Sequence, residues 1–171
     1  MNQYQLRQAT VSDLPEMHRV ISAAMTQYAK DSSIPTVLEA LRETAEDLRE
    51  YVLHDYFLLA FRGEKLVGTL RISQLDEKSA FPPPGLADSA CRTAYISRFA
   101  VLSSMQKLGV GNALFAGAEE YIRNNGYHLA VLHTALTNLP LVRFYTKRKF
   151  ELASTATDRG YPRGTFIKHY V

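Results

Sequence analysis

Apolar residues recur at helical spacing along the first third of the chain. After Ser12 and Asp13, which are favourable helix-capping residues, one apolar face is formed by Leu14, Met17, Ile21, Met25 and Tyr28. The run Thr36–His54 has a similar apolar spacing, with Glu and Arg residues on its other side. We therefore expect two amphipathic helices in this part of the chain.

The spacing then changes to the apolar runs that are typical of β-strands. Tyr56–Arg62 and Leu66–Ser73 are two such runs, and the short turn between them contains glycine, so they predict a hairpin. A short strand is also expected at Tyr4–Arg7. By contrast, Asp76–Thr93 contains three consecutive prolines, which lack the backbone N–H groups that a strand needs, so this segment is predicted to be a loop.

Strands and helices alternate in the second half of the chain. The expected elements are a strand at Tyr95–Val101, a helix at Val110–Asn124, a strand at Leu129–Thr134, a helix from Asn138 to about Arg148, and strands at Glu151–Ser154 and Thr165–Val171. Gly126 is placed to end the first of these helices in a left-handed conformation. No internal repeat or linker interrupts the pattern, so we expect one α/β domain over residues 1–171.

Composition narrows the class of protein further. No apolar stretch is long enough to cross a bilayer and the N-terminus is too polar for a secretory signal, so a soluble cytoplasmic protein without membrane contact is expected. Cys91 is the only cysteine, which excludes an internal disulfide and favours an ordinary thiol over a nucleophile. No Cys/His cluster has metal-ligand spacing, so no metal is expected. The net charge of +3 suits an anionic ligand but is too small to argue for nucleic acid.

The candidate chemistry begins at a glycine pair between a strand and a helix. Gly109 and Gly111 flank the expected helix start, where the first backbone N–H groups have no partner within the helix and the helix dipole favours an anion. Glycine allows a phosphate to approach the backbone closely, and Lys107 adds a positive charge. A tight strand-to-helix junction explains the same pair equally well. Neither the dinucleotide-binding fingerprint nor the P-loop pattern is matched.

Two segments together resemble the GNAT superfamily of N-acetyltransferases. The run QKLGVG at Gln106–Gly111 resembles the superfamily's Gln/Arg-x-x-Gly-x-Gly/Ala signature, and NLPLVRFYTKRKF at Asn138–Phe150 resembles its second motif. The resemblance implies an α/β fold with a mixed, mostly antiparallel central sheet flanked by helices, in which a splayed strand pair holds acyl-CoA. The sequence departs from the family at Lys149, where a glycine commonly precedes the Phe, and this leaves the geometry of that turn open.

The resemblance also implies roles for individual residues, with acetyl-CoA as co-substrate and an amine as acceptor. Backbone groups of Phe99, Ala100 and Val101 would pair with the pantetheine arm. The pyrophosphate would be held by the amides of Gln106, Lys107, Leu108, Gly109, Val110, Gly111 and Asn112. Asn138 would lie at the pantetheine or near the thioester, and Tyr145 would donate a proton to the departing thiolate. By itself, Tyr145 would be read as a half-buried core aromatic.

Other assignments remain open. The basic residues Arg143, Lys147 and Arg148 fit either the nucleotide phosphates or a solvated helix face. Some members of the family have a carboxylate base on the strand that corresponds to Tyr95–Val101, but this strand has no Asp or Glu, and many members use a chain of water molecules. The resemblance therefore leaves a water chain or His133, which has a suitable intrinsic pKa, as the base, and a purely structural His133 is also open. In the family the acceptor site is built from the first helices, a loop and the last strands, so the resemblance points to Tyr28, Phe81, Arg98, Tyr161 and Arg163 as its lining, whereas each of these residues taken alone fits a structural role better.

The sequence thus predicts an acetyl-CoA-dependent N-acetyltransferase that acts on a primary amine of a small molecule or protein. One alternative is a non-catalytic acyl-CoA-binding or sensor domain on the same fold. Another is a nucleotide-binding protein that uses the glycine loop, which the unmatched fingerprints disfavour. The acceptor, the acyl-chain preference and the oligomeric state stay open, although a homodimer is common in the family.

Overall fold

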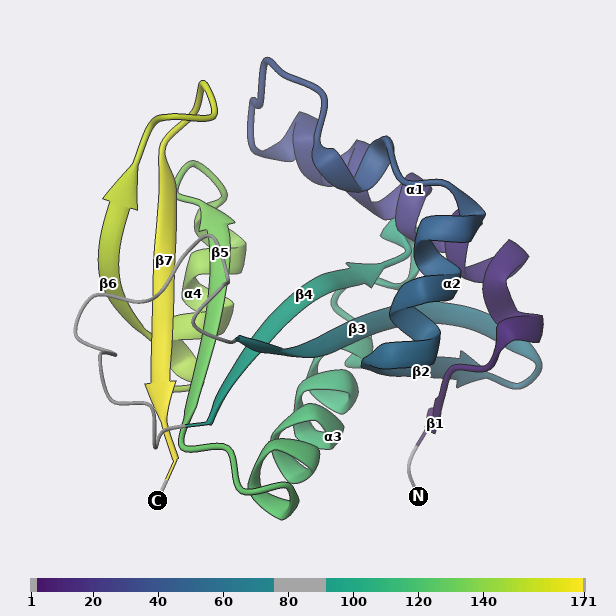
Figure 1. The fold of residues 1–171 in the computed structure, drawn as a ribbon. Coiled ribbons are helices and arrows are strands. Elements are labelled where there is room, and N and C mark those ends of the chain that lie inside the picture. Colours follow the sequence, from purple (N-terminus) through teal and green to yellow (C-terminus); the bar gives the residue numbers. More distant parts are fainter. Residues whose placement is uncertain (1–2, 76–91, 171) are drawn as a thin grey trace.

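A seven-stranded sheet of order β1-β2-β3-β4-β5-β7-β6 forms the centre of the computed structural model, which describes residues 3–75 and 92–170 (Figure 1). The strands are β1 (Gln5–Gln8), β2 (Tyr56–Arg62), β3 (Lys65–Leu75), β4 (Thr93–Val101), β5 (Leu129–Ala135), β6 (Glu151–Ala156) and β7 (Arg163–His169). The helices are α1 (Leu14–Asp31), α2 (Ala45–His54), α3 (Val110–Asn124) and α4 (Leu139–Lys147), with short 3₁₀ turns η1 (Val11–Asp13), η2 (Glu39–Leu41) and η3 (Ser103–Met105). The expected α/β class is confirmed.

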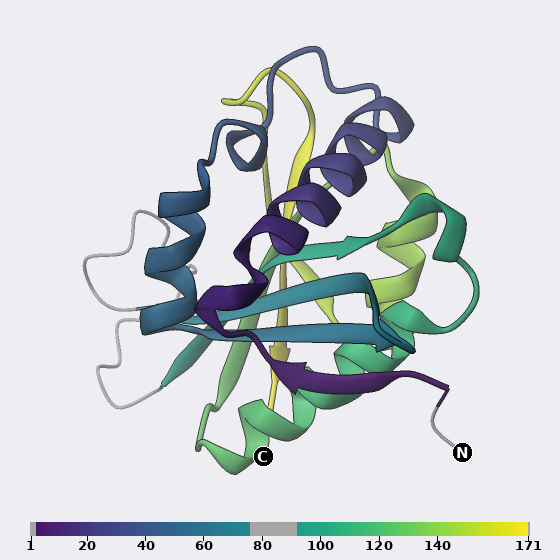
Figure 2. The same cartoon turned by 90° about the vertical axis from the view of Figure 1, so that its right-hand side faces the viewer.

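The sheet is mixed and mostly antiparallel, as expected. Every neighbouring pair of strands is antiparallel except β4 and β5, which run parallel. Helices α1 and α2 cover one face of the sheet and α3 covers the other (Figure 1). Figure 2 shows β1, β2 and β3 between α1 above and α3 below.

The parallel contact between β4 and β5 is short. It extends only from the Thr93–Leu129 pair to the Tyr95–Val131 pair, and beyond Tyr95 the two strands separate (Figure 1). On its other side β4 pairs with β3 along most of its length, and the register shifts near Arg98, which has a φ of 49°. Thr69 Oγ1 donates a hydrogen bond to the Arg98 carbonyl oxygen at 2.8 Å. Such an irregularity bends a strand, so β4 is directed away from β5.

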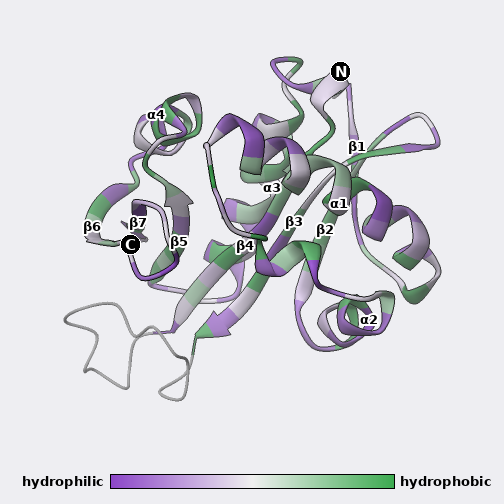
Figure 3. Ribbon diagram, turned by 90° about the horizontal axis from the view of Figure 1, so that it is seen from above, coloured by the Kyte–Doolittle hydropathy of each residue, from purple (hydrophilic) through white to green (hydrophobic). Residues whose placement is uncertain are grey.

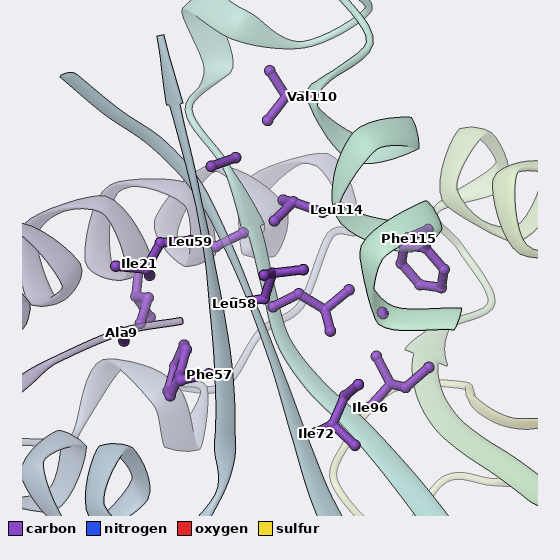
Figure 4. Close-up of a cluster of buried hydrophobic side chains, with 14 of the residues drawn as sticks. Ala9, Ile21, Phe57, Leu58, Leu59, Ile72, Ile96, Val110, Leu114 and Phe115 are labelled. Carbon is purple, nitrogen blue, oxygen red and sulfur yellow. The ribbon is translucent and has the colours of Figure 1, made fainter. Parts of the chain in front are cut away.

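The apolar core lies in two layers because alternate residues of a strand point to opposite faces. On β2, Leu59 lies beside Ile21 of α1, and Leu58 lies on the side of Leu114 of α3 (Figure 4). All four side chains are buried. Burying a side chain of this size contributes roughly 1.5–3 kcal/mol, so the two layers fix both sets of helices against the sheet.

Each helix contributes one apolar face to this arrangement. Hydrophobic and hydrophilic residues alternate along α1, α2 and α3 (Figure 3). This pattern is expected for helices that pack one face against a sheet and leave the other face exposed. Among the helices of the described residues, none combines the length and the apolar character that crossing a bilayer would require.

The helix expected over Thr36–His54 is shorter than predicted, and this expectation was wrong. Residues 36–44 contain only the turn η2, and α2 begins at Ala45. The physical reason is a capping box, in which Thr44 N donates to Asp47 Oδ2 at 2.8 Å and Asp47 N donates to Thr44 Oγ1 at 3.2 Å. This reciprocal pair stabilises a helix start and not a continuous helix. The loop expected at Asp76–Thr93 lies, with Cys91, almost wholly outside the described residues, although Thr93 already belongs to β4.

Helices α3 and α4 end in the same way, with different residues at the critical position. Gly126 after α3 and Lys149 after α4 both have a φ of 69°. In each turn this residue and the next one donate their amides to carbonyls of the last helical turn, which is a Schellman arrangement. The turn at Lys149 therefore has the geometry that glycine would adopt, and an exposed lysine occupies a left-handed conformation that L-residues disfavour.

We expect Lys149→Gly to stabilise the protein. Glycine adopts the left-handed conformation at this position without the strain that lysine has. The substitution should therefore raise the free energy of unfolding by about 1 kcal/mol and Tm by roughly 2–4 °C. Gly126→Ala is the matched control, and it should lower stability by a similar amount because no atom lies within 4 Å of the added Cβ and only the backbone is strained. Thermal and urea unfolding of both variants measure this, and a Lys149→Gly protein less stable than wild type would contradict the explanation.

Candidate functional site

The glycine loop lies directly after the end of β4 that has separated from β5. It contains η3 and two residues in the left-handed region, Lys107 (φ 63°) and Gly109 (φ 89°). The Tyr4 hydroxyl donates a hydrogen bond to the Leu108 carbonyl oxygen at 2.7 Å, which ties the loop to the N-terminal segment. Helix α3 begins at Val110, so the first amides of the helix lie at the open end of the gap. This is the geometry of an anion site.

A side chain at Gly111 would crowd two aromatic rings. A Cβ at this position would lie 3.1 Å from the Phe99 ring and 3.4 Å from the Phe144 ring. Phe99 in turn packs on Phe115 of α3, with ring centroids 4.9 Å apart. The Phe99 side chain therefore joins β4 to the start of α3 and to α4. The sequence interpretation used only the backbone of this residue.

A basic cleft continues from the glycine loop along α4. It is lined by Asn112, Pro140, Arg143, Phe144, Lys147 and Arg148. The Arg148 guanidinium stacks over the Phe144 ring at 3.4 Å from its centroid and donates a hydrogen bond to Asn112 Oδ1. Stacking on an aromatic ring holds a guanidinium in place. Arg148 is therefore fixed at the start of α3, on the side where an anion would be bound.

A cavity of about 150 Å³ occupies the gap between β4 and β5. Of the residues expected at the acceptor site, four line this cavity: Tyr28, Arg98, Tyr161 and Arg163. Phe81 lies outside the described residues. His133 and Tyr145 line the same cavity, so the structure brings together both candidate catalytic residues and most of the candidate acceptor residues.

Tyr145 lies on the wall of the cavity within an aromatic cluster. It is 4% exposed, and its ring lies within 6.3 Å of the rings of Phe99, Phe115 and Phe150, measured between centroids. Burial raises the pKa of the phenol well above its usual value. Tyr145 is therefore protonated over the whole working pH range and can donate a hydrogen bond into the cavity.

His133 faces the cavity from β5. Its Nδ1 lies 3.0 Å from Thr165 Oγ1, and its ring packs edge-on against Tyr95 with centroids 5.5 Å apart. Burial, together with the positive charges of Arg163 and Arg159, lowers the pKa of His133 to about 4. The imidazole is therefore neutral near pH 7, so it can accept a proton but is a weaker base than an exposed histidine.

The side chain of Asn138 has two structural contacts. Its Oδ1 accepts a hydrogen bond from the Leu141 amide at 3.2 Å and so caps α4, as expected for this residue type. Its Nδ2 donates to Ser32 Oγ at 3.1 Å, which connects the end of α1 to the start of α4. These contacts explain an Asn at this position without a ligand, and its contact with the cofactor stays a prediction.

An ion pair that the sequence interpretation missed holds Arg98 in the cavity wall. Arg98 Nε donates to Glu43 Oε2 at 2.9 Å, and the Glu43 side chain is 7% exposed. Tyr51 donates a further hydrogen bond to Glu43 Oε1 at 3.1 Å. Arg98 and Glu43 are 55 positions apart, so no local pattern could have paired them. Within the described ranges, His, Cys, Asp and Glu form no group suited to a metal ion.

The chain was compared with protein families and with curated protein sequences. The model of the acetyltransferase (GNAT) family matches residues 18–150. This range includes β4, the glycine loop, α3, β5 and α4, so it spans the gap and its surroundings. None of the curated protein sequences matches the chain.

Solved structures share the fold at low sequence identity. The PaiA N-acetyltransferase from Thermoplasma acidophilum, in complex with coenzyme A, has a TM-score of 0.78 and 18% identity, over 98% of this chain and 99% of that chain. The ribosomal-protein-alanine N-acetyltransferase from Brucella melitensis has a TM-score of 0.73 and 16% identity, over 97% and 99%. Naa50 from Arabidopsis thaliana, in complex with the bisubstrate analogue CoA-Ac-MVNAL, has a TM-score of 0.72 and 14% identity, over 98% and 99%.

We expect Glu43→Gln to destabilise the protein strongly, because it leaves the Arg98 guanidinium partly buried without a counter-charge. The free energy of unfolding should fall by about 2–3 kcal/mol, and Tm by roughly 5–10 °C. Glu46→Gln is the matched control, since Glu46 pairs with Arg49 at 3.8 Å on the exposed surface of α2, and its loss should cost less than about 0.5 kcal/mol. Equal Tm values for the two variants would show that the Arg98–Glu43 pair does not stabilise the fold.

Proposed function

The chain belongs to the acetyltransferase (GNAT) family, and on this premise we propose that it is an N-acetyltransferase that transfers the acetyl group of acetyl-CoA directly to a primary amine. The observation that carries the proposal is the gap between β4 and β5, which opens beside the amides of the glycine loop and contains Tyr145 and His133. One end of this arrangement suits a phosphorylated cofactor, and the other suits an acyl transfer.

In this proposal acetyl-CoA lies along β4. The amides of residues 106–112 hold the pyrophosphate, and the basic residues of the α4 cleft lie near the nucleotide phosphates. The pantetheine arm enters the gap and pairs with backbone groups of Phe99, Ala100 and Val101, which β5 leaves unpaired. Asn138 lies near the arm. Support comes from the shared fold of the Thermoplasma acidophilum enzyme, whose structure contains coenzyme A.

The proposed reaction is a direct nucleophilic attack. The neutral amine nitrogen bonds to the thioester carbonyl carbon, the C–S bond breaks, and the sulfur leaves as a thiolate. Tyr145 donates its hydroxyl hydrogen to this sulfur as negative charge develops on it, and the phenol then regains a proton from water, so the Tyr145 hydroxyl is restored. The nitrogen loses one proton, which passes to neutral His133 or to water. The products are the amide and CoA.

The proposal also covers the domain organisation of the enzyme, its location and the class of its acceptor. Residues 1–171 act as one acetyltransferase domain in the cytoplasm, which is supported by the single continuous sheet of the described residues and by the use of one cysteine. The acceptor belongs to the class of primary amines, on small molecules or on protein N-termini, and the fold similarity to Naa50 with its CoA-peptide analogue supports including peptides in the search.

Acetyl-CoA should raise Tm, and Tyr145→Phe should reduce turnover more than binding. Saturation at 100 times Kd corresponds to about 2.7 kcal/mol of added stability. Loss of the Tyr145 hydroxyl should lower kcat by roughly 10²-fold or more, with the KM for acetyl-CoA within about twofold. The measurements are thermal shift and thiol release with spermidine, β-alanine, 2-phenylethylamine, an aminoglycoside and the peptide Met-Val-Asn-Ala-Leu.

Tyr170→Phe is the matched control for this experiment. Tyr170 is buried like Tyr145, but its hydroxyl donates to Glu119 at 3.0 Å and it is not among the residues that line the cavity. Its variant should lose stability and retain kcat. Binding of acetyl-CoA without thiol release from any of these amines would favour the non-catalytic acyl-CoA-binding domain, and no thermal shift at millimolar acetyl-CoA would rule out both readings.

The pH dependence of kcat/KM should be set by the pKa of the amine and not by the pKa of His133. The pKa of His133 lies near 4, below its ordinary value, so the imidazole is already neutral at pH 5 and its ionisation lies outside the usual assay range. The amine reacts only when unprotonated, so kcat/KM should rise with pH along a limb set by the pKa of the amine. Two amines of different pKa should shift this limb, and His133→Gln should lower kcat/KM by about tenfold without shifting it. A limb near pH 6.5 that disappears in His133→Gln would contradict this prediction.

A further inference from the structure

One buried hydroxyl in the cavity has no hydrogen-bond partner. Within the part of the chain that the structure describes, Ser97 Oγ is the buried side-chain polar atom without a hydrogen-bond partner. Burying a hydroxyl without a partner is unfavourable, and such groups in folded proteins call for an explanation. Ser97 also lines the cavity. In its present rotamer Oγ has almost no accessible surface, and rotation about the Cα–Cβ bond to another staggered rotamer would turn it toward a molecule bound in the cavity, which can then supply the missing partner.

The position of Ser97 along β4 relates it to the proposed path of the cofactor. The glycine loop follows the C-terminal end of β4, and the gap closes at Tyr95, where pairing with β5 begins. A pantetheine arm that starts at the loop and passes Phe99 would bring the thioester toward this closed end. Ser97 lies between Phe99 and Tyr95, at the level where the reacting group would arrive.

The backbone and the neighbouring groups restrict what Ser97 can do. Its backbone is aligned with Arg71 of β3, so the side chain is carried on a fixed strand. The adjacent Arg98 side chain is a donor only and is directed to Glu43. The Tyr28 hydroxyl already accepts a hydrogen bond from the Ala135 amide at 2.8 Å. Ser97 Oγ therefore adds a hydrogen-bond acceptor to a cavity wall in which Arg98 is directed to Glu43 and Tyr28 already accepts from the Ala135 amide.

An attacking amine needs such an acceptor. A neutral primary amine has one lone pair and two N–H donors, and when the lone pair points at the thioester carbon the N–H groups point away from it. A hydroxyl oxygen placed beside the path can accept one of these N–H bonds and so orient the lone pair. No covalent bond or proton transfer to Ser97 is needed.

We propose that Ser97 Oγ accepts a hydrogen bond from the amino group of the acceptor and is an acceptor-binding residue that orients the nucleophile. This inference rests on the proposed function. It assigns Ser97 to the amine and not to acetyl-CoA, so its removal should change the kinetics of one substrate and not the other.

The test is Ser97→Ala, measured with each amine of the thiol-release panel that the wild-type protein acetylates. We expect kcat/KM for the amine to fall about tenfold, the KM for acetyl-CoA to stay within twofold, and Tm to stay the same or rise because an unpaired buried hydroxyl has been removed. Ser97→Thr retains the hydroxyl on a residue type that strands accept, and it should recover most of the lost kcat/KM.

Thr69→Val is the matched control for removal of a buried hydroxyl. Thr69 Oγ1 donates to the Arg98 carbonyl oxygen, so this variant should lose stability, in contrast to Ser97→Ala. If Ser97→Ala loses stability as Thr69→Val does and its kcat/KM is unchanged, Ser97 has a structural role and the inference is overturned, while the proposed function stands. If the wild-type protein acetylates no amine of the panel, the proposed function fails and this inference fails with it.

Discussion

The short parallel contact between β4 and β5 is the constraint on which the rest of the site depends. Because the two strands pair only between Thr93 and Tyr95, the backbone of β4 beyond this point has neighbours on the β3 side alone. Backbone N–H and C=O groups require partners, and a gap in a sheet leaves them available to an extended ligand. The glycine loop lies at the end of the same strand, so the first amides of α3, which have no partner within the helix, face this opening.

Two kinds of contact hold β4 in its separated course. On one side Phe99 packs with Phe115 and Phe144, so α3 and α4 are fixed relative to the gap. On the other side the ion pair of Arg98 and Glu43 joins the strand to the segment before α2. Arg98 and Phe99, which are adjacent in the chain, thus point to opposite faces of the sheet where the pairing of β4 with β3 shifts register. The cavity lies between an apolar wall and a charged wall, an arrangement that would suit the acyl chain and the polar acceptor of the proposed reaction.

Local patterns in the sequence were sufficient for most of the elements, because capping, turn and periodicity signals act over a few residues, and the anion site at the glycine loop stays a prediction. The capping-box spacing of Thr44 and Asp47 marks the start of α2, but apolar residues at helical spacing also precede Thr44, so periodicity alone predicts a helix that is too long. The pair of Arg98 and Glu43 and the unpartnered Ser97 hydroxyl depend on tertiary contacts, so the sequence alone contains no signal for them. The splayed strands were expected only through the family resemblance. The catalytic roles of Tyr145 and His133 remain predictions.

The hydrogen bond from Tyr4 to Leu108 has a consequence for the dynamics of the protein. It connects the glycine loop to the segment before β1, which is the four-residue strand at one edge of the sheet. Short edge strands open locally at a small fraction of the global unfolding free energy. Each such opening would release Leu108 and loosen the first amides of α3. If the loop binds the cofactor as proposed, its occupancy and the pairing of the edge strand are thermodynamically coupled, and a bound cofactor would suppress fraying of the N-terminal edge.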